Sequence, residues 1–492
     1  MLNLIVLVPI IAAVLVLFGA PARKTAFTAA ILQAVTALLS LLTYDRLGPQ
    51  FQFIQKTVIA AEWDLNYLLA ADGLSLVMLV LTGIVTLAAV WVTPEITRRP
   101  NLFYACVLFI SAGCAGAFAS QDLFFFYAFH ELALIPTFLL IALWGSGERQ
   151  SAAWKITIYL AVGSFVLLIG LIDLYLAIPE QFRTFDMIKL QEMARHNVIP
   201  AAAQSRPYIF LLIGFGILIS LFPFHSWAPG AYASAPTPAA MLHAGVLKKF
   251  GLYGLIRVAL PLLPQGAQHW AHLLLILLVG NILYIGLVTI AQRRLDLMLG
   301  YSSVMHMGYI FLGIAALNVI GVSGAALLMF AHGLSIAALF AMTGILRERA
   351  DSLAFDSLGG VAKAMPFLGA AFGCAAFASI GLPGFANFAS ETLVFFGAFK
   401  PAVASEALAG SFKIATVCAL WGVVISAVYM LRAYKQIFMG EPSKAVASWT
   451  DVVGAARIPV LLLLTALLIA GFAPKTVLNY VKPSVEALVP KK

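Results

Sequence analysis

The sequence has few charged residues, and this scarcity excludes most soluble folds. Charged residues occupy 10% of the 492 positions and hydrophobic residues occupy 62%, whereas soluble domains carry about 25% charged and about 45 to 50% apolar residues. A transmembrane helix needs about 20 mostly apolar residues, because the hydrocarbon core of a bilayer is about 30 Å thick. Most of the chain divides into segments of this length, so we expect a multi-pass integral membrane protein.

The chain also lacks the motifs of nucleotide and redox chemistry. It has no GxGxxG dinucleotide motif, no P-loop and no haem-attachment motif. Its four cysteines lie in apolar segments without a CxxC or iron-sulfur ligand spacing, which is typical of small packing residues. We therefore expect no cofactor in this chain. The cysteines are Cys106, Cys114, Cys374 and Cys418.

Acidic residues are fewer than basic ones, with 21 Asp and Glu against 30 Lys and Arg, for a net charge of +9. In a soluble protein this excess would raise the question of nucleic acid, but here it indicates topology. If the N-terminus lies outside, the basic residues fall in the inside loops, as the positive-inside rule requires. We therefore expect no nucleic-acid partner. The expected inside loops carry Arg23, Lys24, Arg98, Arg99, Arg149, Lys155, Arg293, Arg294, Arg347, Arg349, Arg432 and Lys435, and the short outside loops carry far fewer.

The apolar segments predict an all-α polytopic fold of about 14 transmembrane helices. The first stretch lacks the basic start and cleavage site of a signal peptide, so we count it as a helix. Two more polar connections, 44–72 and 179–206, are expected to lie over the membrane surface. The expected helices are 2–20, 25–43, 73–95, 101–119, 122–144, 153–178, 207–227, 238–257, 270–291, 299–318, 323–346, 366–399, 411–434 and 456–473.

Two of these segments contain sequences that break a helix. Pro223 and His225 lie in LFPFHSWAPG at the end of the seventh, and Gly381, Pro383 and Gly384 lie in GLPGFANFASE within the twelfth. In transporters, broken helices near the midplane mark ion sites, because free carbonyls and half-helix ends can bind an ion or its water. The five-helix separation between the two breaks suggests two related repeats.

These repeats divide the chain into four parts. Residues 1–100 hold helices 1–3, and residues 101–258 hold the first repeat, with helices 4–8. Residues 259–435 hold the second repeat, with helices 9–13, and residues 436–492 hold helix 14 and a C-terminal tail.

Glu131 is an acid inside the apolar segment FFFYAFHELALIPTFLLIALWG. A charge at the bilayer centre costs about 2.5 to 3.5 kcal/mol on insertion scales. Pro136 removes the backbone N–H that would bond the carbonyl of Leu132, which loosens the helix beside this acid. Glu131 could serve only to hydrogen-bond a neighbouring helix, but Asn or Gln would do so at lower cost. We predict a proton site at Glu131.

Lys248 and Lys249 lie deep in the segment PTPAAMLHAGVLKKFGLYGLIR. Adjacent helical positions point about 100° apart, so the two lysines cannot share one face, and one of them should face a polar interior. Desolvation and nearby carboxylates change the proton affinity of a lysine in opposite directions. A carboxylate that moves relative to Lys249 could therefore load and unload a proton.

Glu391 follows the Gly-Pro break of the twelfth segment and is well placed to use it. Four histidines also lie in separate apolar segments, and an ordinary pKa of about 6.5 suits histidine for proton relay. Each alone could equally be a satisfied helix-contact residue, but together they favour a line of polar groups along the midplane. These histidines are His225, His243, His306 and His332.

Five blocks of the sequence, in this order, resemble a known family and together cover most of the chain. They are FHELALIPTFLLIALWG, LFPFHSWAPGAYASAPTPAAMLHAGVLKKFGLYGLIR, RRLDLMLGYSSVMHMGYIFLGI, MFAHGLSIAALF and SIGLPGFANFASETLVFFGAF. The family comprises the antiporter-like membrane subunits of proton-pumping NADH:quinone oxidoreductase, respiratory complex I. Within it the chain is similar to the subunit M type, the equivalent of mitochondrial subunit 4.

The resemblance implies two inverted five-helix repeats and a half-channel from each side, joined by polar residues along the midplane. By motif, Glu131 matches the acid of the fifth helix, Lys249 the lysine of the eighth and Glu391 the acid of the twelfth. His306 and His332 match histidines of the polar axis.

The sequence departs from the family pattern at two positions. The lysine of the seventh helix is replaced by Leu218, and the histidine after the following turn is replaced by Tyr232, whereas His243 resembles the histidine of the related subunit L type. The usual central proton carrier is therefore missing.

The resemblance also implies partners. These are L- and N-type antiporter-like subunits, a K-type small subunit, and subunits that carry flavin and iron-sulfur clusters. The expected location is the bacterial cytoplasmic (inner) membrane, with the N-terminus outside, and the expected ion is the proton, because protonated Lys and His cannot ligate Na⁺.

Two other functions fit the same residues. One is a subunit of a multisubunit cation/proton antiporter or a membrane-bound hydrogenase. The other is a non-pumping scaffold subunit, because Leu218 removes an ionisable group.

Overall fold

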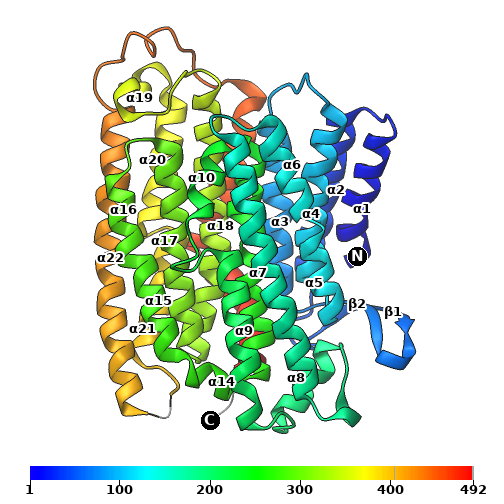
Figure 1. The fold of residues 1–492 in the computed structure, drawn as a ribbon. Helices are drawn as coiled ribbons and strands as arrows, with labels where there is room; N and C mark the ends of the chain where they lie inside the picture. Colours follow the sequence, from blue (N-terminus) through cyan, green and yellow to red (C-terminus); the bar gives the residue numbers. More distant parts are fainter. Residues whose placement is uncertain (404, 490–492) are drawn as a thin grey trace.

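Long apolar helices that run roughly side by side make up most of the molecule (Figure 1). The structure is a computed structural model and describes residues 1–403 and 405–489. In this part of the chain, 11 helices are long and apolar enough to cross a membrane. The chain is therefore a multi-pass membrane protein, as the composition predicts.

The first half of the chain contributes mainly long helices. They are α1 (Leu2–Leu17), α2 (Ala22–Thr43), α3 (Gly73–Val92), α4 (Pro100–Ala119), α5 (Leu123–Glu131), α6 (Leu134–Trp144), α7 (Arg149–Ala177), α8 (Met187–Arg195), α9 (Ala201–Ile219) and α10 (Trp227–Ser234), with short 3-10 turns at Ala61–Trp63 and Glu180–Phe182.

A helix with two π-helical segments opens the next part. It runs through α11 (Thr237–Leu242), η3 (His243–Leu247), α12 (Lys249–Gly254), η4 (Leu255–Ala259) and α13 (Leu260–Leu262), and α14 (Pro264–His269) follows it. A third π-helical segment, η5 (Gly280–Tyr284), joins α15 (Ala271–Val279) to α16 (Ile285–Ala291).

The remaining helices complete the bundle. They are α17 (Leu295–Ala315), α18 (Val319–Arg347), α19 (Val361–Ala364), α20 (Pro366–Ile380), α21 (Ala386–Phe399), α22 (Glu406–Phe438), α23 (Ile458–Phe472) and α24 (Lys475–Leu488), with 3-10 turns at Phe355–Ser357 and Gly454–Arg457.

The centre of the bundle is formed by α18, which packs against α17, α21, α3 and the π-helical segment η3. Its most apolar 18-residue window is entirely buried inside the molecule, whereas α2 and α23 bury only a third of theirs. Large apolar side chains such as Trp154, Phe165 and Trp421 are exposed on the outer helices. Exposed apolar surface of this kind suits contact with lipid. The central helix α18 instead contacts other helices of the bundle.

The helix breaks occur where proline and glycine predict them. The seventh segment ends at Ile219 and the chain resumes as α10, while α20 and α21 are separated by residues 381–385. Both preceding helices end at a left-handed residue, Ser220 with φ 69° and Gly381 with φ 82°. The segment predicted as 122–144 also divides, since α5 ends at Glu131 and α6 begins at Leu134, which is the weakening expected from Pro136.

The expectation of an entirely α-helical chain is wrong in one place. Strands β1 (Gln52–Ala60) and β2 (Leu65–Ala71) form an antiparallel hairpin within the connection 44–72. The hairpin extends from the side of the bundle in Figure 1. Its first strand, QFIQKTVIA, is rich in β-branched residues, a signal that a search for long apolar runs does not detect.

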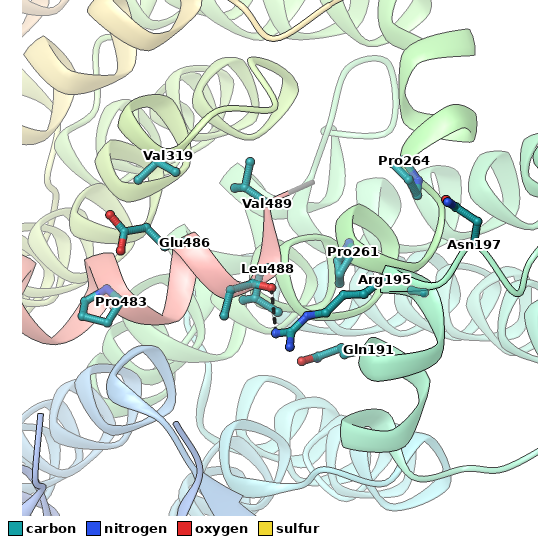
Figure 2. A pocket seen from close by; sticks show the side chains of 12 residues that line it. Gln191, Arg195, Asn197, Pro261, Pro264, Val319, Pro483, Glu486, Leu488 and Val489 are labelled. Atoms are coloured by element: carbon teal, nitrogen blue, oxygen red, sulfur yellow. Dashed lines mark hydrogen bonds between the residues drawn. The ribbon is translucent and has the colours of Figure 1, made fainter. Parts of the chain in front are cut away.

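The connection at 179–206 and the C-terminal tail also contain helices outside the fourteen predicted segments. The connection contains α8, and the tail contains α24, which packs against α3 and α18. A cavity of about 920 Å³ opens between α8, α14 and α24, and Gln191, Arg195 and Glu486 are among its lining residues (Figure 2). The lining residues include none of the eight candidate site residues, so this cavity lies apart from the predicted axis.

Candidate functional site

Lys249 is at the middle of the polar contacts inside the bundle. Its Nζ atom donates to the carbonyl of Ala244 at 2.7 Å and lies 2.9 Å from Nδ1 of His332 on α18. Lys249 is 0% exposed and His332 is 2% exposed. A buried ammonium group requires hydrogen-bond partners, and here an imidazole supplies one that can itself carry a proton.

His306 extends this contact toward the second helix break. Its ring centroid is 5.4 Å from that of His332. Its Nδ1 and Nε2 atoms lie 2.8 Å from the carbonyl of Ser302 and 2.9 Å from the carbonyl of Ser379. A neutral imidazole has one N–H and can satisfy only one of these carbonyls, whereas an imidazolium satisfies both. The geometry therefore gives a proton a second place to reside.

Glu391 faces the break between α20 and α21. The side chain is buried, and its Oε1 atom has no hydrogen-bond partner among the described residues. A Cβ atom built on Gly381 would lie 2.5 Å from Oε2 of Glu391. The absence of a side chain at Gly381 thus leaves space for the carboxylate beside the interrupted backbone.

The Lys248 side chain has different neighbours from those of Lys249. This difference is expected, because adjacent helical positions point about 100° apart. Its Nζ atom lies 5.6 Å from the ring centroid of Tyr232 and has no hydrogen-bond partner within the described chain. The Tyr232 hydroxyl is 3.2 Å from Nδ1 of His243. Tyr232, one of the two positions where the sequence departs from the family pattern, therefore contacts His243 and lies next to Lys248.

Glu131 lies at the edge of the bundle, at the end of α5. The Ser164 hydroxyl on α7 donates to its Oε1 atom, and His130 Nδ1 lies 3.8 Å from the same oxygen. The carboxylate-bearing side chain is 36% exposed, unlike those of Lys249 and Glu391. Glu131 therefore connects the interior to a surface that lipid or a neighbouring protein would cover.

His225 lies apart from the contacts among Lys249, His332 and His306. It lies in the break between α9 and α10, where its ring stacks on Phe222 with centroids 5.8 Å apart. No hydrogen bond between described residues links it to Lys249, His332 or His306. The structure thus brings together Lys249, His332 and His306 directly, and leaves His225 at the first break.

The chain is similar to known proteins in sequence and in fold. The family model described as "NADH:quinone oxidoreductase/Mrp antiporter, TM" matches residues 120–416, a range that contains all eight candidate residues. The chain belongs to this family. It is 37% identical to the "NAD(P)H-quinone oxidoreductase chain 4 2" of Thermosynechococcus vestitus over 89% of this chain and 82% of that one.

Two further members of the family are similar over nearly their whole length. The "NADH-quinone oxidoreductase subunit M" of Rickettsia conorii is 34% identical over 95% of this chain and 92% of its own. A chain in the solved structure "Respiratory complex I from Thermus thermophilus with bound NADH" is 27% identical, with a TM-score of 0.88 and complete coverage of both chains. The fold is thus that of the NADH:quinone oxidoreductase/Mrp antiporter family.

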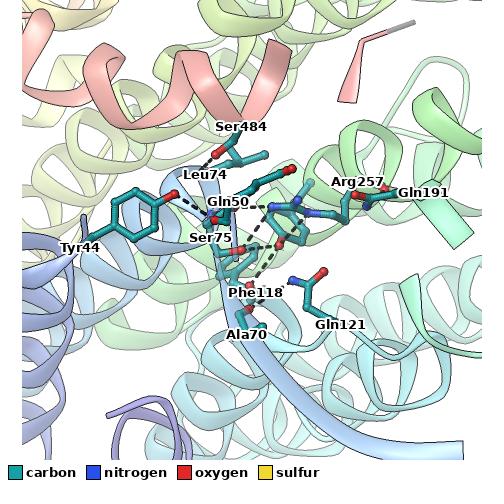
Figure 3. Close-up of polar contacts among 12 residues, drawn as sticks. Tyr44, Gln50, Ala70, Leu74, Ser75, Phe118, Gln121, Gln191, Arg257 and Ser484 are labelled. Carbon is teal, nitrogen blue, oxygen red and sulfur yellow. Dashed lines mark hydrogen bonds and ion pairs between the residues drawn. The ribbon is translucent and has the colours of Figure 1, made fainter. Parts of the chain in front are cut away.

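The sequence analysis missed two groups of ionisable residues. One is His130, which could have been noticed as a second titratable residue beside Glu131. The other is an ion pair in which Arg257 Nη2 lies 2.6 Å from Asp72 Oδ1, with both side chains 0% exposed. Tyr253 and Ser75 complete the network around the guanidinium group (Figure 3). Arg257 and Asp72 lie at the ends of predicted helices, so neither was marked as intramembrane.

No cluster for a metal ion is found where the structure describes the chain: there, no three His, Cys, Asp or Glu residues are grouped so that they could hold one. The chemistry available to the described residues is the binding and release of protons by lysine, histidine and carboxylate groups.

Proposed function

We propose that this chain is a proton-translocating membrane-arm subunit of an NADH:quinone oxidoreductase, and that it acts in the enzyme only as part of the assembly. Electron transfer in other subunits would drive proton movement through this chain. The contact between Lys249 Nζ and His332 Nδ1, buried at the centre of the bundle, carries the proposal. Two basic groups at 2.9 Å cannot both be protonated at low cost, because like charges repel strongly in a medium of low dielectric constant. A proton is therefore shared or exchanged between them.

In this mechanism the proton moves along a series of neighbouring side chains, from Lys249 toward Glu391. Lys249 exchanges a proton with His332, and His306 lies next to His332 and contacts the carbonyl of Ser379 near the break. Glu391, on the other side of the break, releases the proton outward. Lys248 and His243 supply further titratable groups beside Lys249, and His225 lies at the first break.

Glu131 takes the role of a charge sensor at the edge of the subunit. Its partly exposed carboxylate sits among exposed apolar side chains such as Ile135 and Phe165. A carboxylate in contact with lipid is unfavourable, which supports a neighbouring subunit at this surface. A charge change in that neighbour would alter the field at Glu131 and, through it, the proton affinity of Lys249.

We infer that the fold has fourteen transmembrane segments in two inverted five-helix repeats. Three segments add to the eleven helical spans that are long and apolar enough to cross a membrane, and they support the total of fourteen: α1, the π-containing helix from Thr237 to Leu262, and the broken pair α20 and α21. The two breaks, with left-handed residues at Ser220 and Gly381, support a repeat relation between the regions 101–258 and 259–435. We place the N-terminus outside the bacterial cytoplasmic membrane, because this puts the basic loops inside.

The proposed partners are L- and N-type antiporter-like subunits and a K-type small subunit in the membrane. Flavin and iron-sulfur clusters would be held by other subunits. The family also includes Mrp antiporters, so the second candidate is a subunit of a multisubunit cation/proton antiporter. The apolar Leu218, which packs on Gly163 of α7, favours the third candidate, a non-pumping scaffold.

One purification distinguishes the first two candidates. The native complex that contains this chain would be isolated in mild detergent and its subunits identified by mass spectrometry. Flavin and iron-sulfur subunits would support the redox-driven pump, whereas antiporter-like chains alone would contradict it. Proton-to-electron ratios of Lys249→Met complexes in proteoliposomes then test the scaffold, because a scaffold would keep the full ratio.

A further inference from the structure

A second titratable group adjoins Glu131 and has no role in the mechanism above. His130 and Glu131 are the last two residues of α5, immediately before the backbone interruption that precedes α6. The His130 side chain is 3% exposed, and its Nδ1 atom lies 3.8 Å from Oε1 of Glu131. This atom has no hydrogen-bond partner among the described residues. A buried, unpaired imidazole nitrogen that faces a carboxylate is costly, and it gains a favourable partner when it binds a proton.

The ring of His130 stacks on an aromatic side chain of the helix that carries Lys249. It stacks on Phe250 with centroids 4.1 Å apart, and Phe250 stacks in turn on Phe126 at 4.5 Å. Phe250 directly follows Lys249 on the same helix. The imidazole therefore lies between the acid at the edge of the subunit and the helix that carries the central lysine.

The groups around the pair leave Glu131 without a lysine or arginine partner among the described residues. Ser164 donates to Glu131 Oε1, and the Tyr127 hydroxyl faces the same carboxylate from α5. His243 on the neighbouring helix is the other titratable group that faces His130. Among ion pairs of the described chain, Glu131 has only His130 as a partner. A carboxylate with no lysine or arginine partner stabilises an imidazolium beside it.

The neighbouring position on α9 cannot supply that charge. Leu218 packs on Gly163, and Gly163 adjoins Ser164, which hydrogen-bonds Glu131. A basic side chain at 218 would lie against α7 at Gly163, one residue before Ser164. With leucine there, His130 is the basic residue in contact with the acid.

We propose that His130 is the titratable partner of Glu131 and that the two side chains bind and release one proton as a unit. Nδ1 of His130 takes the proton of the Glu131 carboxyl group, which gives an imidazolium beside the ionised carboxylate. When the field at Glu131 changes, the same proton returns from Nδ1 to the carboxylate, and the neutral imidazole and carboxylic acid are restored. A movement of about 1 Å would bring the two groups within hydrogen-bond distance. This inference rests on the proposed function of the chain as a proton-translocating subunit.

The test compares the proton-to-electron ratio of purified complexes in proteoliposomes across pH 6 to 9. His130→Phe keeps a flat ring for stacking on Phe250 but cannot titrate, and we expect it to lose most proton translocation. His130→Lys keeps a basic group, and we expect it to retain translocation and to extend it to higher pH, since the ordinary pKa of lysine, about 10.4, exceeds that of histidine. His269→Phe, a change to an exposed histidine at the end of α14, is the matched control.

A compensating variant isolates charge from packing. If His130 supplies the basic partner, the double variant His130→Phe with Leu218→Lys should recover translocation that His130→Phe alone has lost. If His130→Phe does not assemble, His130→Gln and His130→Lys are compared instead, and equal ratios and pH profiles for these two overturn the proposal.

The outcomes also separate this inference from the proposed function. Wild-type pumping by His130→Phe together with loss of pumping by Lys249→Met overturns the role of His130 and leaves the pump intact. Wild-type pumping by both variants contradicts the proposed function itself.

Discussion

Lys249 and His332 are separated by 83 residues, yet their Nζ and Nδ1 atoms lie 2.9 Å apart in the centre of the bundle. The contact joins the helix with π-helical segments to α18, the most buried helix of the fold. Lys248, the adjacent residue, is as deeply buried but lacks a hydrogen-bond partner in the described chain. The two lysines are thus chemically alike and structurally different, which allows a direct comparison.

Replacing Lys249 by methionine should lower proton translocation by about tenfold or more, because it removes one of the two groups that exchange the proton. Lys248→Met removes a charge that makes no hydrogen bond and should have a smaller effect. The initial rate of proton uptake, measured with a pH-sensitive dye in proteoliposomes, would be compared at equal quinone reduction. Equal losses of proton translocation in the two variants would contradict the different roles assigned to Lys249 and Lys248.

Glu131→Gln should lose proton translocation while the chain still inserts and assembles, since the amide keeps the shape and hydrogen bonding of the acid but not its charge. Ser164→Ala removes only the hydroxyl that donates to Glu131 and should reduce translocation less. Both variants would be assayed for assembly by native gel electrophoresis and for the proton-to-electron ratio. Full pumping by Glu131→Gln would exclude the proposed role of this acid.

Gly381→Ala should disturb both the second helix break and Glu391. Gly381 has φ 82°, and the added Cβ atom would lie 2.5 Å from Oε2 of Glu391. The left-handed conformation costs an L-residue about 1 to 2 kcal/mol, and the carboxylate must also move. We expect a lower thermal unfolding temperature and reduced translocation. Gly410→Ala, at a helical position with no atom near the added Cβ, is the control and should change neither quantity.

The buried pair of Arg257 and Asp72 should matter for stability. Asp72→Ala leaves a guanidinium group without its counter-charge, at a cost of about 3 to 5 kcal/mol. The double variant Asp72→Leu with Arg257→Met removes both charges and should recover much of that loss. Thermal unfolding of the purified complex, scanned at one fixed rate, would measure both. If the double variant unfolded at a lower temperature than Asp72→Ala, the instability of Asp72→Ala could not be attributed to the unpaired guanidinium group.

The link between the hairpin and α8 should depend on pH. Partial burial raises the pKa of Asp64, but hydrogen bonds from Lys189, Thr184 and Asn66 outweigh burial and lower that pKa from its ordinary 3.8 to about 2. Because the folded form holds the acid ionised, its contribution is complete above about pH 4 and is lost as the pH falls through 2. The contribution should therefore be constant at neutral pH.

Asp64→Asn tests this link by hydrogen exchange of α8. The variant should speed exchange in residues 187–195 at pH 7, where the wild-type carboxylate accepts from Lys189 and Thr184 at 2.6 Å. The exchange rates of the wild type and of Asp64→Asn should converge as the pH falls and Asp64 becomes protonated. Glu180→Gln, in the same connection but without a described ion pair, serves as the comparison and should not change exchange.

The sequence by itself determined the membrane fold and the residues worth testing, because the cost of placing a charge or a proline in an apolar helix depends mainly on the local sequence. Glu131, Lys249 and Glu391 stand out for this reason, and the breaks at Pro223 and Gly381 follow from the same local rules. The roles of these residues stay predictions, since they depend on proton movement rather than on position.

Only the tertiary structure decided which of those groups meet. The pairing of Lys249 with His332, of Asp72 with Arg257 and of the hairpin with α8 depends on packing between segments far apart in the chain. The hydrophobic pattern of one segment does not determine how a neighbouring helix is rotated about its own axis. These contacts could therefore not be predicted from the sequence. The same reason explains why His130 was overlooked: its burial and its unpaired nitrogen exist only once Phe250 and α7 pack around it.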